Sequence, residues 1–359
     1  MWLYVLHRIG MELICIKRLY LILGNGFSID LINKLSKNAE IDLNNLFSKG
    51  TNVEFPKSEE NGFLSMKHCP NLWMLGARTT MTNSESYGLI NNIITCANVY
   101  NLSFKNNVHK NDNNETSNYI KAYNELTYYI RYLFIHYNSI VSDEDLKSIL
   151  PNINLINYIS DKYDEYDKIV IVTYNYDIWL ERLLTQKGLK FDIAGFENTD
   201  AKIKVFKPHG SISFSFNTKS SETSPFKIRY DMYDDITQNV EDFSVKYDLE
   251  NDFPIINAII PPAGDAGRSG LGWISQIRNG LKDVLNSSTT DDDVIIFGVS
   301  YWHVDRNELD EIFVRLANNV NIKYINPKPA SELDAVLTSL FSNYIHYCND
   351  KMIGGKLNE

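Results

Sequence analysis

The stretch Arg18–Ser28, RLYLILGNGFS, decides the fold, because it joins an apolar run to a glycine turn. A short apolar run that ends at glycine is typical of a strand buried on both faces of a parallel sheet. Apolar residues then recur at helical spacing from Ile29 to Leu35. The sequence therefore predicts the order strand, glycine turn, helix, preceded by a leading extension.

The same unit recurs along the chain. We predict further strands in Asp167–Asp177, Lys204–Phe214, Asp291–Asp305 and Val320–Pro329, the second of them interrupted by Pro208–His209–Gly210. Helical patterns follow the strands at residues 178–188 and 307–319. Strands that alternate with helices predict an α/β fold, a Rossmann-like parallel sheet flanked by helices.

We expect one domain, residues 1–359. Two of its segments do not follow the alternation of strands and helices. Residues 42–159 contain an Asn-rich loop, Lys105–Asn118, and then a long amphipathic helix, so we expect a helical insertion there. The tyrosine-rich face of that helix is interpreted as packing surface rather than as a ligand site. Residues 217–254 form a second, polar insert.

Composition limits the classes of ligand. The chain has 35 Lys and Arg against 45 Asp and Glu, with no cluster of five or more basic residues, so direct nucleic-acid binding is not expected. The four cysteines lie far apart and form no C-x-x-C pair, and the seven histidines are scattered, so no metal site is predicted. Free cysteines fit a cytoplasmic protein. Charged residues interrupt the apolar N-terminus, so neither a membrane span nor a signal peptide is expected.

The glycine turn Gly24–Asn25–Gly26–Phe27–Ser28 is the first candidate binding motif. Its glycines let the backbone approach a pyrophosphate, and the following helix points its N-terminus at the phosphates. A third glycine is absent, so the dehydrogenase fingerprint is not met. A plain strand-to-helix turn is the alternative.

Two further strand ends carry residues suited to catalysis. Asn175 and Asp177 follow an apolar strand, where ligands of open α/β sheets gather, although Asn and Asp are also common helix caps there. His209 lies between Pro208 and Gly210 and can serve as a general base near neutral pH. A buried, hydrogen-bonded histidine is the alternative.

The last two strand ends offer Gly298 with Ser300, and Asn326. Each alone is explained as well by turn chemistry. In a parallel sheet, however, all five strand ends meet at one edge. The ordered set therefore predicts one shared pocket.

The five motifs resemble, in order, those of the sirtuin superfamily, which shows G-A-G-x-S, T-Q-N-x-D, H-G, G-x-S and I-N. Here they read GNGFS at 24–28, TYNYD at 173–177, HG at 209–210, GVS at 298–300 and IN at 325–326. The resemblance spans residues 20–327. Within the superfamily, the chain resembles most closely the sirtuin-like NAD hydrolases of bacterial antiphage defence systems. The chain is similar to that branch at three further places, namely Asn25 in the first turn, Pro261–Pro262 and Trp273.

The chain differs from the sirtuin deacylases in one feature that bears on its activity. Sirtuin deacylases carry two C-x-x-C pairs on a zinc module between the histidine and the G-x-S strand, and this chain has no cysteine there. The polar insert 217–254 stands in place of that module. Deacylation is therefore rejected as the main activity, and no metal cofactor is expected.

The resemblance implies an enzyme that cleaves NAD, as its substrate, into nicotinamide and ADP-ribose. Asn175 is expected to orient water or the ribose hydroxyls, His209 to accept a proton, and Asp177 to bind the carboxamide. The turn Gly24–Ser28 is expected to hold the pyrophosphate of NAD. The adenosine side of NAD is expected to contact Gly298, Ser300 and Asn326. An ADP-ribosyltransferase or cyclase, and a non-catalytic NAD or ADP-ribose sensor, are the alternatives.

The resemblance also implies NAD depletion in abortive infection. The chain is too short for a fused sensor domain, so the trigger is expected to be a separate partner. A HerA-type ATPase encoded beside the gene is the expected partner, and homo-oligomerisation is expected as well.

Overall fold

A computed structural model describes residues 16–58, 60–105, 117–219, 224–230, 238–261, 272–301 and 306–353, the backbone alone at 101–105. The predicted leading extension at 1–15, residues 106–116 of the Asn-rich loop, Pro262 and residues 302–305 lie outside this range. The statements below concern the described residues.

A seven-stranded parallel sheet forms the centre of the molecule. In spatial order its strands are β10 (Asn343–Tyr347), β9 (Asn321–Ile325), β8 (Asp293–Phe297), β1 (Arg18–Leu23), β2 (Lys168–Thr173), β4 (Ile203–Phe206) and β3 (Phe191–Ile193). All six residues of β1 are buried, which accounts for their continuous apolar run. Leu19 of β1 is in register with Ile169 of β2 on one side and Asp293 of β8 on the other.

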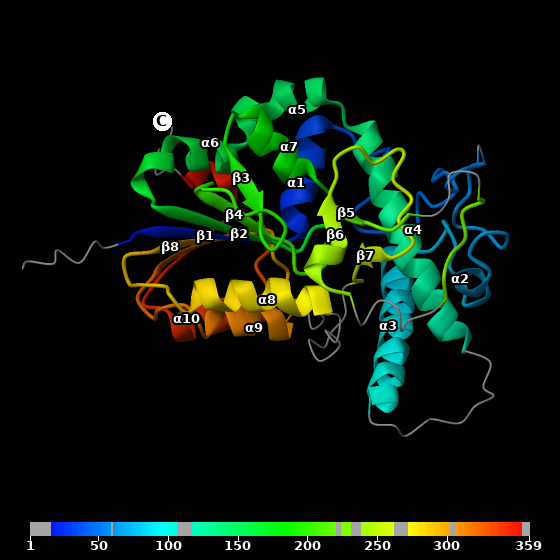
Figure 1. The fold of residues 1–359 in the computed structure, drawn as a ribbon. Coiled ribbons are helices and arrows are strands. Elements are labelled where there is room, and N and C mark those ends of the chain that lie inside the picture. Colours follow the sequence, from blue (N-terminus) through cyan, green and yellow to red (C-terminus); the bar gives the residue numbers. More distant parts are fainter. Residues whose placement is uncertain are drawn as a thin grey trace, which may run out of the picture.

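Helices cover both faces of this sheet, as Figure 1 shows. One face carries α1 (Asn25–Leu35), α5 (Asp143–Ile149), α6 (Asn154–Asp161) and α7 (Trp179–Gln186), and the other carries α8 (Gly272–Leu285), α9 (Arg306–Phe313) and α10 (Ser331–Leu340). Short 3-10 helices lie at Leu150–Asn152, Tyr163–Glu165, Val240–Asp242 and Asp350–Met352. The predicted α/β class, a Rossmann-like parallel sheet flanked by helices, is confirmed.

The prediction of one strand over Lys204–Phe214 is wrong, because the chain changes sheets inside it. The parallel strand β4 ends at Phe206, and β5 (Gly210–Phe216) lies between β6 (Phe243–Val245) and β7 (Asn257–Ile259) in an antiparallel sheet. Pro208 has no N–H group for a sheet hydrogen bond, and Gly210 has a φ of 82°, which breaks an extended strand. His209 therefore sits at the corner between two sheets.

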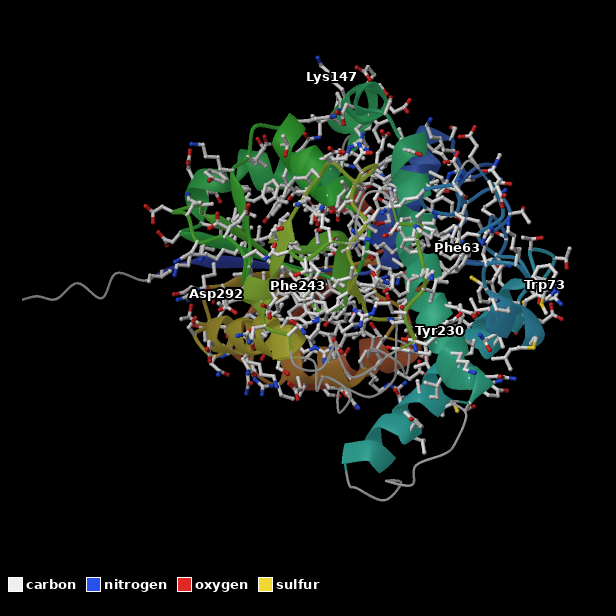
Figure 2. All side chains as sticks on the ribbon, turned by 45° about the vertical axis from the view of Figure 1, so that its right-hand side comes forward. Phe63, Trp73, Lys147, Tyr230, Phe243 and Asp292 are labelled. Carbon is white, nitrogen blue, oxygen red and sulfur yellow. The ribbon has the colours of Figure 1, made fainter. Side chains whose placement is uncertain are left out.

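A helical region lies beyond the C-terminal ends of the parallel strands (Figure 1). It consists of α2 (Pro70–Met74), α3 (Asn83–Lys105) and α4 (Asn118–Ile140). The tyrosine-rich face of α4 packs internally, because the ring of Phe63 lies 5.9 Å from that of Tyr129 and 5.7 Å from that of Tyr132. Figure 2 shows Phe63 beside α4 and Asp292 at the other end of the molecule.

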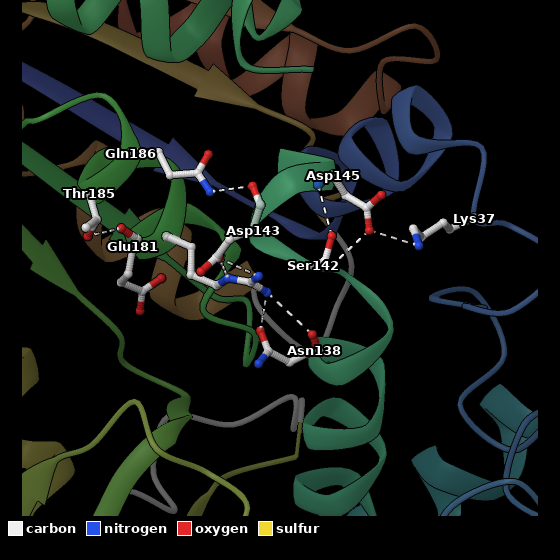
Figure 3. A network of polar contacts seen from close by, with 9 residues as sticks. Lys37, Asn138, Ser142, Asp143, Asp145, Glu181, Thr185 and Gln186 are labelled. Atoms are coloured by element: carbon white, nitrogen blue, oxygen red, sulfur yellow. Dashed lines mark hydrogen bonds and ion pairs between the residues drawn. The ribbon is translucent and has the colours of Figure 1, made fainter. Parts of the chain in front are cut away.

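Polar contacts fix the corner between α4 and α5 against α7, as Figure 3 shows. Arg182 of α7 donates to Asp143 Oδ1 at 2.7 Å and to Asn138 Oδ1 at 3.0 Å. Ser142 and Asp145 form a capping box at the start of α5, and Asp145 also pairs with Lys37 at 3.0 Å. This corner holds α4 in place beside the strand ends.

Arg131 of α4 bonds both to the antiparallel sheet and to the loop between β6 and β7. Arg131 lies 3.0 Å from Asp252 and donates to the carbonyl oxygen of Phe214 at 3.0 Å. Both charged side chains are almost fully buried, so either one alone would be costly.

Within the part of the chain that the structure describes, no helix is long and apolar enough to cross a bilayer.

Candidate functional site

A pocket of about 880 Å³ lies at the C-terminal ends of the parallel strands. It spans the point where β1 has β2 on one side and β8 on the other, which is where doubly wound sheets bind ligands. Its volume falls in the range of about 300–1,000 Å³ that holds small ligands. The predicted residues that line it are Gly24, Asn25, Gly26, Asn175, Asp177, His209, Gly298, Ser300 and Asn326.

The remaining two predicted residues, Phe27 and Ser28, are buried and are not among the residues that line the pocket. The helical region supplies an apolar wall through Tyr87 and Ile90 of α3 and Phe134 of α4. Sequence reasoning assigned none of these three residues to the site, because helical periodicity does not distinguish a pocket wall from core. The strand ends contribute polar side chains such as Asn175 and His209 beside apolar ones such as Phe297 and Ile325.

The glycine turn packs directly against the end of β8. Gly24 N donates to Phe297 O at 3.0 Å, and Gly26 N donates to Gly298 O at 2.9 Å. A Cβ on Gly26 would lie 2.5 Å from Gly298 Cα, and Gly298 has a φ of 64°. The glycines are therefore needed for a close crossing of two backbones, whatever they contact in the pocket.

The start of α1 faces the pocket through Asn25 and Gly26, and Asp30 of its second turn also lines the pocket. Its first turn contains no acidic residue, but the N–H groups of Gly26 and Phe27 are bonded to Gly298 O and Gly24 O. The helix N-terminus therefore attracts an anion through its partial positive charge rather than through these two N–H groups. Asn25 is exposed and donates from Nδ2 to Leu43 O at 3.1 Å. This bond attaches the turn to the loop that leads into the helical region.

Asn175 belongs to a buried hydrogen-bond network. Its Nδ2 donates to Gly24 O at 3.1 Å and to Ser28 Oγ at 2.9 Å. Ser28 Oγ in turn donates to Asp177 Oδ2 at 2.7 Å. The residues of two predicted motifs are thus joined below the pocket floor through Ser28.

Asp177 has the helix-capping role that was its alternative, and it also lines the pocket. Its Oδ1 accepts from the backbone N–H of Trp179, the first residue of α7, at 3.1 Å. Burial raises the pKa of Asp177, and the nearby charge of Lys207 and the bond from Ser28 oppose that rise.

A buried lysine connects the two loops that carry Asn175 and His209. Lys207 Nζ donates to the carbonyl oxygen of Asp177 at 2.5 Å and to Glu181 Oε1 at 2.7 Å. The Lys207 and Glu181 side chains are 0% and 1% exposed. Sequence reasoning missed this pair, since only the fold brings the two positions together.

His209 is buried at the pocket wall, 4% exposed. Its Nε2 lies 3.3 Å from Glu308 Oε2, and its ring centroid lies 4.9 Å from that of Tyr174. The other oxygen of Glu308 accepts a hydrogen bond from Arg278 of α8. The sequence gives no signal for Glu308 as a partner of His209, because its position predicts only a place in the helix that follows β8.

The charge of Glu308 is stabilised in this position. Burial alone would raise its pKa, but the charges of His209 and Arg278 and their hydrogen bonds hold the pKa of Glu308 below its usual value. A histidine beside such a carboxylate keeps its ring orientation and gains stability when protonated. The pocket therefore contains a candidate general base with a defined partner.

Ser300 and Asn326 differ in exposure and in the hydrogen bonds that they make. Ser300 is exposed at the pocket rim. Asn326 Nδ2 donates to Val299 O at 3.1 Å and to Tyr324 Oη at 3.0 Å, and its Oδ1 accepts from Lys328 N at 3.0 Å. Asn326 thus links the ends of β8 and β9, as its turn alternative requires.

The arrangement offers a histidine–carboxylate pair, a buried amide, a helix N-terminus and an apolar wall around one volume. Among the residues with described positions, no three His, Cys, Asp or Glu side chains are grouped to hold a metal ion. Comparison of the sequence with protein-family models and with curated proteins finds no match.

Proposed function

We propose that this protein is an NAD hydrolase that cleaves the bond between nicotinamide and ribose. The observation that carries the proposal is the convergence of the glycine turn, Asn175 and His209 on one pocket at the switch point of the sheet. The ordered resemblance of these motifs to sirtuin-like NAD hydrolases supports the same substrate.

The reaction divides among the pocket residues. Water adds to C1′ of the ribose as the C1′–N bond breaks, and the electron pair of that bond neutralises the pyridinium nitrogen of nicotinamide. His209 accepts the proton that the water loses, with Glu308 beside the resulting imidazolium. General-base catalysis of this kind contributes about 10²–10⁴-fold to a rate.

Asn175 is proposed to position the water or the ribose hydroxyls beneath the anomeric carbon. Its Nδ2 is bonded to Gly24 and Ser28, which fixes the orientation of the amide. The N-terminus of α1 is proposed to face the pyrophosphate, and Ser300 at the rim to face the adenosine side. Asp177 is proposed to contact the carboxamide.

The biological setting is part of the proposal. NAD depletion in antiphage defence requires that the enzyme stay silent until triggered, so a HerA-type ATPase partner and self-assembly are proposed as the controls. The helical region and the segment 217–254 are the surfaces proposed for these contacts.

A non-catalytic NAD or ADP-ribose sensor is the second candidate. The observation that favours it is that Asn175, Asp177 and Asn326 all make hydrogen bonds that support the fold. A binding pocket needs such bonds, whether or not it turns over its ligand.

The experiment incubates the full chain with NAD, alone and with its genomic neighbour, and separates the products by chromatography. Equal amounts of nicotinamide and ADP-ribose support hydrolysis. Cyclic ADP-ribose, or ADP-ribose attached to an acceptor, supports the transferase or cyclase alternative. NAD that binds tightly and is recovered intact under both conditions supports the sensor and contradicts hydrolysis.

A further inference from the structure

The contact between His209 and Glu308 joins two elements that no motif relates. His209 lies at the corner between β4 and β5, and Glu308 lies in the first turn of α9. Nε2 of His209 and Oε2 of Glu308 are 3.3 Å apart, and the two side chains are 5% and 11% exposed. A carboxylate this buried interacts with the imidazole with little screening by solvent.

Arg278 completes the group from a third element. It lies on α8, is 14% exposed, and donates from Nη2 to the second oxygen of Glu308. The carboxylate is therefore held from both sides, and its oxygens cannot rotate freely away from His209. Glu308 thus contacts His209 at the pocket wall through one oxygen and Arg278 of α8 through the other.

We propose that Glu308, oriented by Arg278, is the positioning residue that fixes the His209 ring and stabilises its protonated form. The inference rests on the proposed function, in which His209 accepts a proton during NAD cleavage. Glu308 is a positioning residue rather than a catalytic one, because it is absent from the residues that line the pocket.

Other charged or titratable groups near His209 have partners of their own. Lys207, two residues earlier, is bonded to Asp177 O and Glu181. Asp177, which also lines the pocket, accepts hydrogen bonds from Ser28 Oγ and Trp179 N, and the Tyr174 ring contacts the His209 ring edge-on. In the described part of the chain, Glu308 is the carboxylate that pairs with His209.

The test follows the titration of His209 by NMR in the full chain labelled at histidine. The signal is assigned by its loss in His209→Asn. We expect Glu308→Gln, which keeps the shape and an acceptor oxygen, to lower the proton affinity of His209 about tenfold or more.

Glu311→Gln is the matched control. It removes the same charge from the same helix, but Glu311 is 45% exposed and pairs with Lys282 at 2.7 Å. We expect it to leave the titration and the rate of nicotinamide release unchanged.

Kinetics supply the second readout. With NAD as substrate, we expect Glu308→Gln to lower kcat at pH 7 more than it raises KM, and to shift the acid limb of the pH–rate profile to lower pH. An unchanged His209 titration in Glu308→Gln overturns the inference, and so does a shifted titration with an unchanged rate. A wild-type chain that releases no nicotinamide, either alone or with its genomic neighbour, contradicts the proposed function instead, and the NMR titration then decides the Glu308–His209 coupling by itself.

Discussion

At the scale of single residues, some pocket groups are proposed to act on the substrate, whereas others hold the backbone in place. His209 belongs to the first kind. We expect His209→Asn, a polar replacement that cannot accept the proton, to lower kcat by about 10²–10⁴-fold with little change in KM. Steady-state nicotinamide release measures both constants, and a wild-type kcat in this variant contradicts the role of His209.

Ser300 is predicted to affect binding alone. It is exposed at the rim, so Ser300→Ala is expected to raise KM for NAD several-fold while kcat stays near the wild-type value. The same assay measures this effect. A large loss of kcat without a change in KM contradicts an adenosine-side role.

Gly298 belongs to the second kind of residue. Gly298→Ala combines a left-handed backbone, with φ of 64°, and a Cβ placed 2.5 Å from Gly26 Cα. We expect the free energy of unfolding to fall by about 2–5 kcal/mol, from backbone strain and overpacking together. Urea denaturation measures this loss.

Gly188→Ala is the control for the backbone contribution. Gly188 has a φ of 76°, and an added Cβ there has nothing within 4 Å. It is expected to lose only about 1–2 kcal/mol. Equal losses at the two positions contradict the close crossing of the glycine turn and β8.

At the scale of elements, the buried Lys207–Glu181 pair joins the loop after β4 to α7 and to the loop after β2. Lys207→Met leaves the carboxylate of Glu181 buried without its cation and is expected to cost about 3–5 kcal/mol. The double variant Lys207→Met, Glu181→Gln is expected to recover part of that stability. Urea denaturation of the two single variants and the double variant measures the coupling, and additive losses contradict it.

The sequence predicts elements well where burial produces a continuous signal. The strands β1, β2 and β8 are predicted from apolar runs that are buried on both faces, whereas β9 alternates, with Asn321 exposed and Lys323 half-buried. The three-residue β3 and the half-exposed edge strand β10 give no such run. The change of sheet at Pro208–Gly210 was visible as an interruption, but its direction depends on pairing with β6 and β7, far along the chain.

At the scale of the whole molecule, the parallel sheet explains why residues from five separate segments line one pocket. This convergence was predictable, because parallel strands end at a common edge. The hydrogen-bond and ion-pair partners of those residues could not be predicted from the sequence. Ser28 beneath Asn175, Lys207 beneath Asp177 and Glu308 behind His209 depend on contacts that only the folded chain creates.

The helical region is the part of the molecule that the motifs do not explain. It closes one side of the pocket with Tyr87, Ile90 and Phe134, and the corner at Arg182 and Asp143 holds it against α7. A partner that binds this region acts on a wall of the pocket itself. This arrangement gives the proposed control by a partner a direct physical route to the site.

The central claim is that the pocket cleaves NAD rather than only binding it. A real-time proton NMR record of NAD with the full chain and its genomic neighbour tests this most directly. The account predicts that the nicotinamide signals of NAD are replaced by those of free nicotinamide at the rate at which ADP-ribose appears, and that His209→Asn stops both. NAD signals that broaden on binding but persist unchanged would contradict it.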